Sequence, residues 1–236
     1  MTASLIVIRA TEFIVIAADS CVSDVSDRET GTCCKIVQVG NFVYVPNKFA
    51  GHSDSGYYLD QIIKNVGPAD SLSVWVPLLT RAIEPALTKA LEAQRKQELI
   101  RWMEQFETRE ALRITLAGIE NGGVALVNLV FEIKNLNAPN VELEIKANWC
   151  PGPDCPGGIA MMLVAADEFK TRFQQENRDY WEGDVERVAK NAEAFVQKAI
   201  DEKIPGVGPP ISVLVISASG FDWRKSGLCG SQPPEP

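Results

Sequence analysis

The sequence predicts an α/β protein of the α+β kind, a four-layer αββα sandwich in which two antiparallel sheets are flanked by helix pairs. Short apolar, β-branched runs without polar alternation are typical of strands buried on both faces. Helical patterns occur between these runs in pairs, so the elements follow the order strands, two helices, strands, two helices, strand. We therefore expect two sheets packed together with helices outside.

Turn residues bound most of the expected strands. Glu120-Asn121-Gly122-Gly123 is a strong hairpin signal between two apolar runs, and residues 20–31 are polar enough to form a loop. The expected strands cover residues 5–8, 13–18, 34–39, 41–45, 112–119, 124–133, 141–146 and 211–217.

The expected helices differ in how clearly their ends are marked. Ser53 or Asp54 can cap the first one, and Gly67-Pro68 stops it. The second is long and is interrupted or kinked at its two prolines, and the last shows one continuous apolar stripe. The expected helices cover residues 53–66, 73–106, 159–177 and 184–203.

Length and charge limit the class of protein. We expect a single domain over residues 1–230, followed by a proline-rich, disordered tail at 231–236. The net charge of −8 argues against nucleic acid or an anionic membrane surface as a partner. The N-terminus has no basic segment before its apolar run, and no apolar stretch reaches the ~18 residues that would span a bilayer. These features favour a cytoplasmic protein.

Six cysteines leave the redox compartment open. Cys150 and Cys155 lie in a Pro-Gly-Pro-Asp loop and could form a disulfide, which would favour a periplasmic or secreted protein that has lost a signal peptide. Six free thiols in a reducing cytosol are the alternative. Cys33 and Cys34 are adjacent and His52 is the single histidine, so no structural zinc site is expected.

The first fifty residues carry the most specific pattern. A threonine at position 2 precedes an apolar hairpin that ends in Ala-Ala-Asp19-Ser, and Lys35 stands sixteen positions after Asp19. Phe49-Ala50-Gly51 follows and leads into the first expected helix. This pattern resembles the opening of proteasome β-subunits and of the bacterial two-component proteasome-like peptidase, members of the N-terminal-nucleophile hydrolase superfamily.

The resemblance implies a threonine-type peptidase or amide hydrolase. Thr2, exposed by removal of Met1, would be the nucleophile and its α-amine the base, since that amine has a pKa near ~7.7–8.0. Lys35 would stabilise the deprotonated hydroxyl, Asp19 would hold Lys35 charged, and the Gly51 N–H would bind the oxyanion. The resemblance also implies a peptide or amide substrate, self-association into a homo-oligomer, and no metal or organic cofactor.

Departures from the family pattern support a second hypothesis. Thr2 and Asp19 are one residue further apart than in the family, so Thr2 needs a bulge or longer loop at residues 10–12 to reach the site. Cys21 stands where active members usually have a basic residue, and Pro156 where a serine assists the amine. The alternative is a catalytically inactive proteasome-fold subunit with a structural or binding role.

Overall fold

The structure is a computed structural model of the 236-residue chain. It describes residues 5–23, 29–32, 34–97, 99–153, 155, 160–176 and 182–227. The chain forms two compact units. Unit 1 comprises residues 1–38, 117–126 and 149–236, and unit 2 comprises residues 39–116 and 127–148. The single domain over residues 1–230 stays a prediction.

The N-terminal hairpin forms the centre of unit 1. Strands β1 (Leu5–Arg9) and β2 (Phe13–Ala18) pair antiparallel from Leu5↔Ala18 to Arg9↔Ile14 without a register shift. The Ala10 N–H donates to the Phe13 carbonyl at 2.8 Å, so the turn between the strands is short. Side chains at positions 5–8 and 14–18 are at most 2% exposed, so both faces of the hairpin are buried, as the sequence predicts.

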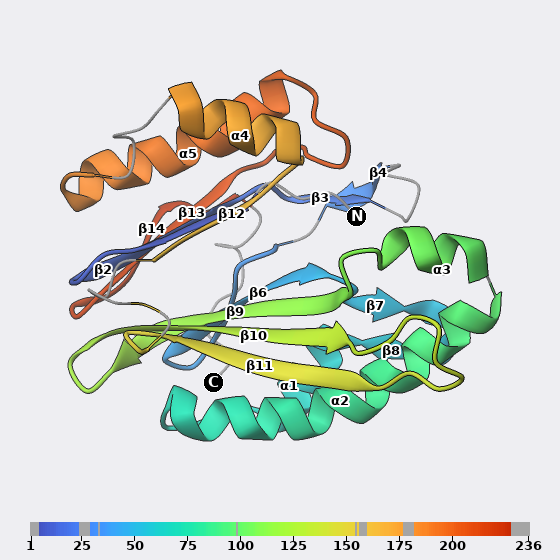
Figure 1. The fold of residues 1–236 in the computed structure, drawn as a ribbon. Coiled ribbons are helices and arrows are strands. Elements are labelled where there is room, and N and C mark those ends of the chain that lie inside the picture. Colours follow the sequence, from blue (N-terminus) through green and yellow to red (C-terminus); the bar gives the residue numbers. More distant parts are fainter. Residues whose placement is uncertain are drawn as a thin grey trace. The chain divides into compact units, whose positions relative to one another are not determined.

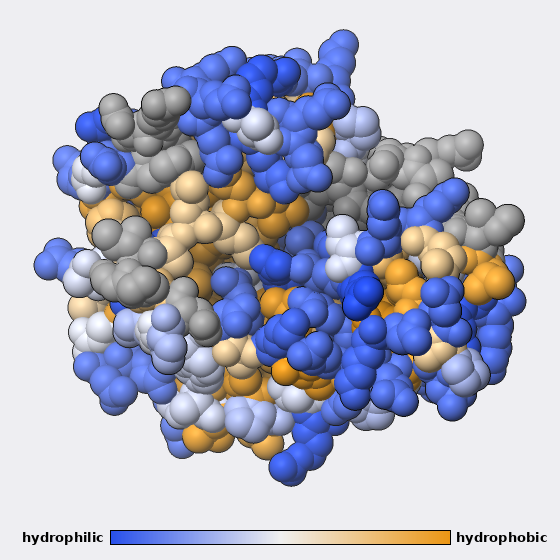
Figure 2. All heavy atoms as spheres, viewed as in Figure 1, coloured by the Kyte–Doolittle hydropathy of each residue, from blue (hydrophilic) through white to orange (hydrophobic). Residues whose placement is uncertain are grey.

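Three more strands complete the sheet that contains this hairpin, and two helices pack against it. The sheet has the order β12-β1-β2-β13-β14, with β12 at Ala160–Val164, β13 at Ser212–Ser217 and β14 at Gly220–Lys225. Helices α4 (Asp167–Glu176) and α5 (Val185–Asp201) pack their apolar side chains against one face of this sheet (Figure 1). Their other side is mostly hydrophilic (Figure 2), as amphipathic surface helices require.

The second five-stranded sheet has the order β11-β10-β9-β6-β5. Asn121 and Gly122 join β9 to β10 with φ angles of 53° and 77°, which is the turn that the Asn-Gly pair predicts. The tip of this hairpin, residues 117–126, belongs to unit 1. The strands are β5 (Val37–Val39), β6 (Phe42–Lys48), β9 (Glu110–Glu120), β10 (Gly123–Ile133) and β11 (Leu143–Cys150).

Three helices belong to unit 2. These are α1 (Leu59–Val66), α2 (Leu72–Gln97) and α3 (Leu99–Gln105). The indole of Trp75 on α2 stacks on Phe42 of β6 with ring centroids 5.7 Å apart, which fixes α2 against the sheet. The fold class is therefore confirmed, because the chain is an α+β protein with two large antiparallel sheets, consistent with a sandwich.

Three expected elements are corrected by the structure, and one strand is added. Residues 160–164 form β12 and not the start of a helix, because they pair with all five residues of β1 and supply an edge to the sheet. Residues 20–31 include two short strands, β3 (Cys21–Ser23) and β4 (Glu29–Thr32). Strand β14 was not expected. The first helix begins at Leu59, after a 3₁₀ turn (Ser53–Ser55) and the pair β7 (Gly51–His52) and β8 (Tyr57–Tyr58).

No helix in the described part of the chain is both long enough and apolar enough to cross a membrane.

Candidate active site

Asp19 and Lys35 form a buried ion pair at the end of β2. The Lys35 Nζ donates to Asp19 Oδ1 at 2.7 Å. The Asp19 side chain is fully buried, and that of Lys35 is 13% exposed. A carboxylate in such a place is stable only if it is paired and hydrogen-bonded. The sequence spacing of sixteen thus corresponds to a direct contact in unit 1.

A second contact holds the other oxygen of Asp19. The Gly208 N–H donates to Asp19 Oδ2 at 3.2 Å, and the Ser20 N–H donates back to the Gly208 carbonyl at 3.2 Å. These two bonds join the end of β2 to the loop before β13, and they orient the carboxylate that faces Lys35. The sequence pattern did not predict Gly208 as a site residue, although its position between Gly206 and the Pro209-Pro210 pair indicates a turn.

Ser20, which follows Asp19 in the sequence, carries a buried hydroxyl. The residue is fully buried, and within the described part of the chain its Oγ has no hydrogen-bond partner. A buried hydroxyl without a partner is uncommon in folded proteins and is worth explaining. Ser20 is not among the site residues that the sequence predicts.

The predicted nucleophile, Thr2, lies outside the described residues. The hairpin after it is described, and it has neither a bulge nor a longer loop at residues 10–12. The register of β1 and β2 is uninterrupted and the turn is short. The additional residue between Thr2 and Asp19 is therefore not absorbed in the hairpin.

Gly51 belongs to unit 2 and begins the short strand β7. It pairs with Tyr58, and the flanking ladder bond runs from the Leu59 N–H to the Ala50 carbonyl at 3.0 Å. Gly51 therefore occupies a non-hydrogen-bonded position, and its N–H points away from β8. A side chain there would meet its nearest atoms at 3.6 Å, so local packing alone does not require glycine.

His52 makes local contacts beside Gly51. Its Nδ1 lies 3.0 Å from Ser55 Oγ, and its ring lies 5.8 Å from that of Phe49. Ser55 Oγ also donates to the His52 carbonyl at 3.1 Å. Both polar contacts therefore stay within a single turn of the chain.

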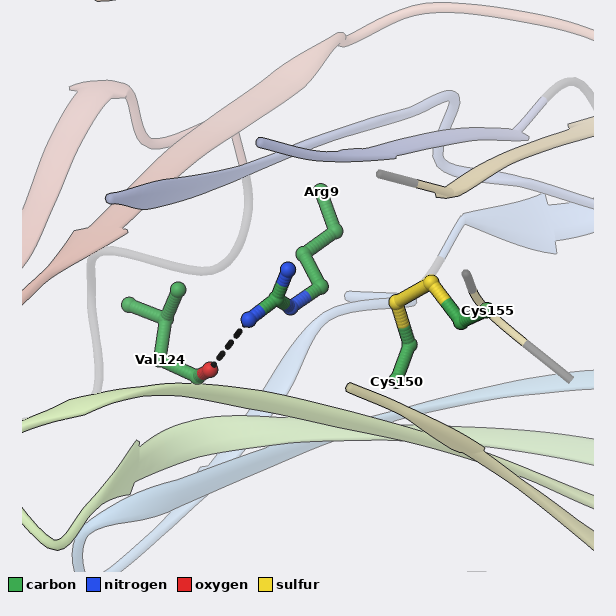
Figure 3. The surroundings of a disulfide bond; sticks show 4 residues. All are labelled: Arg9, Val124, Cys150 and Cys155. Atoms are coloured by element: carbon green, nitrogen blue, oxygen red, sulfur yellow. Dashed lines mark hydrogen bonds between the residues drawn. A yellow bond between two sulfur atoms is a disulfide. The ribbon is translucent and has the colours of Figure 1, made fainter. Parts of the chain in front are cut away.

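Of the two alternatives left open for Cys150 and Cys155, the structure contains the disulfide. The two cysteines form a disulfide with Cα atoms 5.2 Å apart (Figure 3). Cys34 is also disulfide-bonded. In the described part of the chain, no group of three or more histidine, cysteine, aspartate or glutamate side chains could hold a metal ion.

Comparisons with known proteins bear on the fold. No protein-family model matches the sequence, and no curated protein matches it. A solved structure of Anbu, the Gly-1 mutant from Hyphomicrobium sp. strain MC1, matches 98% of this chain and 89% of that chain. The TM-score is 0.56 and the sequence identity is 12%. Anbu is a bacterial proteasome-like N-terminal-nucleophile protein.

The likeness supports a proteasome-like fold. At 12% identity it shows the fold alone and says nothing of a threonine nucleophile. It agrees with the family that the opening residues resemble. The chemistry proposed below therefore depends on Asp19, Lys35 and the residues around them.

Proposed function

We propose that the chain is a threonine-type N-terminal-nucleophile hydrolase that cleaves peptide or other amide bonds. The observation that carries the proposal is the buried ion pair between Asp19 and Lys35, at 2.7 Å and held by Gly208. Burying a charged pair is expensive, and a hydrophobic pair of similar size would often serve stability equally well. A role in chemistry gives a reason for the pair.

Each residue has a distinct task in this proposal. Removal of Met1 exposes the α-amine of Thr2, which takes the proton of the Thr2 hydroxyl during attack on the carbonyl. Lys35 stabilises the negative oxygen and disfavours protonation of the nearby amine, while Asp19 keeps Lys35 oriented. The Gly51 N–H, which points away from β8, binds the oxyanion.

The second candidate function is a catalytically inactive proteasome-fold subunit with a structural or binding role. The uninterrupted register of β1 and β2 favours it, because the extra residue between Thr2 and Asp19 is not taken up by a bulge. Pro156 and Cys21 stand where the family has an assisting serine and a basic residue. Under this hypothesis the ion pair is a structural remnant of the site.

We also propose that the protein is a homo-oligomer, as the resemblance to proteasome subunits implies. Sedimentation of the purified protein then gives a mass that is a multiple of 25.9 kDa at micromolar concentration. A mass of 25.9 kDa at every concentration would contradict this part of the proposal.

Hydrolysis of a panel of fluorogenic peptide amides tests the two candidates. Intact mass first establishes whether Met1 has been removed. If the chain is a hydrolase, the processed wild type turns over substrate. The rate falls to background in Thr2→Ala and decreases by roughly 10²-fold or more in Lys35→Met. Lys146→Met, which removes an exposed lysine paired with Glu132, is the matched control and should retain activity. Equal rates in wild type and Thr2→Ala would favour the inactive subunit.

A further inference from the structure

Arg9 is a buried cation at the end of an otherwise apolar strand. The residue is 5% exposed, and burial lowers the pKa of its guanidinium from the ordinary value. Arg9 and Asp19 are the two buried charged residues of the described part of the chain. Asp19 has Lys35 as its counter-ion, whereas Arg9 donates from Nη2 to the Val124 carbonyl at 3.1 Å.

Two donors of Arg9 remain unused. Its Nε and Nη1 are buried and, among the described residues, have no hydrogen-bond partner. An unsatisfied buried donor destabilises the fold, and more so when the group is charged. The guanidinium therefore presents two nitrogen donors, Nε and Nη1, that would bind an anionic acceptor strongly.

The alternation of β1 determines where these donors lie. Ile6 and Ile8 belong to the core beneath α4 and α5. Arg9 has the opposite parity and lies on the other face of the sheet. On that face it lies in the surroundings of the Cys150–Cys155 disulfide, with its guanidinium between the disulfide and Val124 (Figure 3). Cys150 and Cys155 are 3% and 6% exposed, so the sulfurs share its buried environment.

A neutral disulfide is a poor acceptor for a guanidinium, but a thiolate is a good one. A nearby arginine lowers the pKa of a cysteine thiol, whereas burial in apolar surroundings raises it. We propose that Cys150 and Cys155 form a reducible redox site in which Arg9 stabilises the thiolate of the reduced state. The two unused donors of Arg9 gain their acceptor when the disulfide opens. This site does not depend on Thr2 or on hydrolysis.

The reaction needs a dithiol reductant, either a small molecule or a protein with two vicinal thiols. A thiolate of the reductant attacks one sulfur, forms a mixed disulfide and releases the other cysteine as a thiolate. The second thiol of the reductant then closes its own disulfide and releases the remaining cysteine. Two electrons pass to the protein, and one cysteine keeps its negative charge beside Arg9 while the other takes up a proton.

Charges near the sulfurs set the direction of the expected effect. The positive charge considered is that of Arg9, which lies in the surroundings of the disulfide (Figure 3). Asp154 stands between the two cysteines in sequence and lies outside the described residues. A carboxylate would raise the pKa of a neighbouring thiol, so an Asp154→Asn variant separates its effect from that of Arg9.

The test measures the pKa of each thiol in the full-length reduced protein. Alkylation rates of Cys150 and Cys155 are followed against pH by peptide mass spectrometry, under conditions in which circular dichroism shows the native fold. The proposal predicts that one of the two titrates below the ordinary thiol value of about 8.5. Burial without help from Arg9 predicts that both titrate above it. The second result in the wild type would overturn the proposal, even if no variant folds.

Arginine variants then assign the effect. Arg9→Met should shift the equilibrium with dithiothreitol about tenfold towards the disulfide and raise the low thiol pKa by about one unit. Arg9→Lys, which keeps the charge, should recover part of both changes. Arg172→Met removes a cation from α4, on the opposite face of the sheet, and should change neither. Equal values for Arg9→Met and Arg172→Met would refute the role of Arg9.

Discussion

At the scale of single residues, the fully buried carboxylate of Asp19 is the feature with the largest energetic consequence. It accepts hydrogen bonds from Lys35 Nζ and from the Gly208 N–H. If Lys35 is removed, Asp19 loses its ion pair with Lys35 Nζ but keeps its buried charge. If Asp19 becomes asparagine, the amide can still accept from Gly208, and Lys35 is 13% exposed and can reach water.

We therefore expect unequal effects from the two halves of the pair. Lys35→Met should lower the free energy of unfolding by about 3–5 kcal/mol, and Asp19→Asn should lower it by less. The double variant Asp19→Leu with Lys35→Met should lose less than the sum of its single changes, because no charge is left behind. Urea unfolding measures all of them. Additive losses would show that the two side chains are not coupled.

The site residues differ in how far the sequence could predict them. Asp19 comes directly after a predicted strand, and Lys35 stands sixteen positions later. In the structure the two side chains are in direct contact. Gly208 lies 189 positions after Asp19, and its contribution is a backbone N–H that no residue type signals. The absence of a bulge in the hairpin depends on turn geometry and register, which a count of residues does not determine.

At the scale of elements, the β9–β10 hairpin depends on a turn that glycine makes possible. Gly122 has a φ of 77°, in the left-handed region, whereas the neighbouring Gly123 does not have a positive φ. A side chain at Gly123 would meet its nearest atom, the Glu120 carbonyl oxygen, at 3.9 Å. The two adjacent glycines therefore differ in backbone conformation, while a methyl group fits at either.

Gly122→Ala should lower the free energy of unfolding by about 1–2 kcal/mol, because alanine is strained at positive φ. Gly123→Ala is the matched control and should change it by less than about 1 kcal/mol. Thermal or urea unfolding of the two variants gives the comparison. A Gly123→Ala variant that is less stable than Gly122→Ala would contradict this account of the turn.

Elements with a clear period or turn signal are those that the sequence predicted best. The β9–β10 hairpin and α5 agree with expectation, since one carries Asn-Gly and the other a continuous apolar stripe with Asp184 as its cap. The apolar run at 160–164 fits either a strand or a helix by local pattern. Its pairing with β1 decides between them, and that contact spans about 150 residues of sequence.

At the scale of the whole molecule, the single domain expected over residues 1–230 can be tested through its cooperativity. Each of the two compact units has its own buried side chains: β1, β2 and β13 in unit 1, and β6 and α2 in unit 2. One domain predicts that amides of both units exchange with the same free energy under conditions that favour global unfolding.

Hydrogen exchange followed by peptide mass spectrometry in increasing urea measures these free energies. Peptides from β2 and from β6 should converge on one value, since a single cooperative unit opens as a whole. Two separate plateaus would show that the units unfold independently and that the chain contains two domains.

The central claim is that Thr2 is an N-terminal nucleophile beside the Asp19–Lys35 pair. Tandem mass spectrometry of the protein after reaction with a peptide boronate or epoxyketone tests it most directly. The account predicts that Met1 is absent, that an epoxyketone adduct maps to Thr2, and that Lys35→Met slows its formation by roughly 10²-fold or more. Retained Met1, or no adduct on a processed Thr2, would contradict the hydrolase and leave the inactive proteasome-fold subunit.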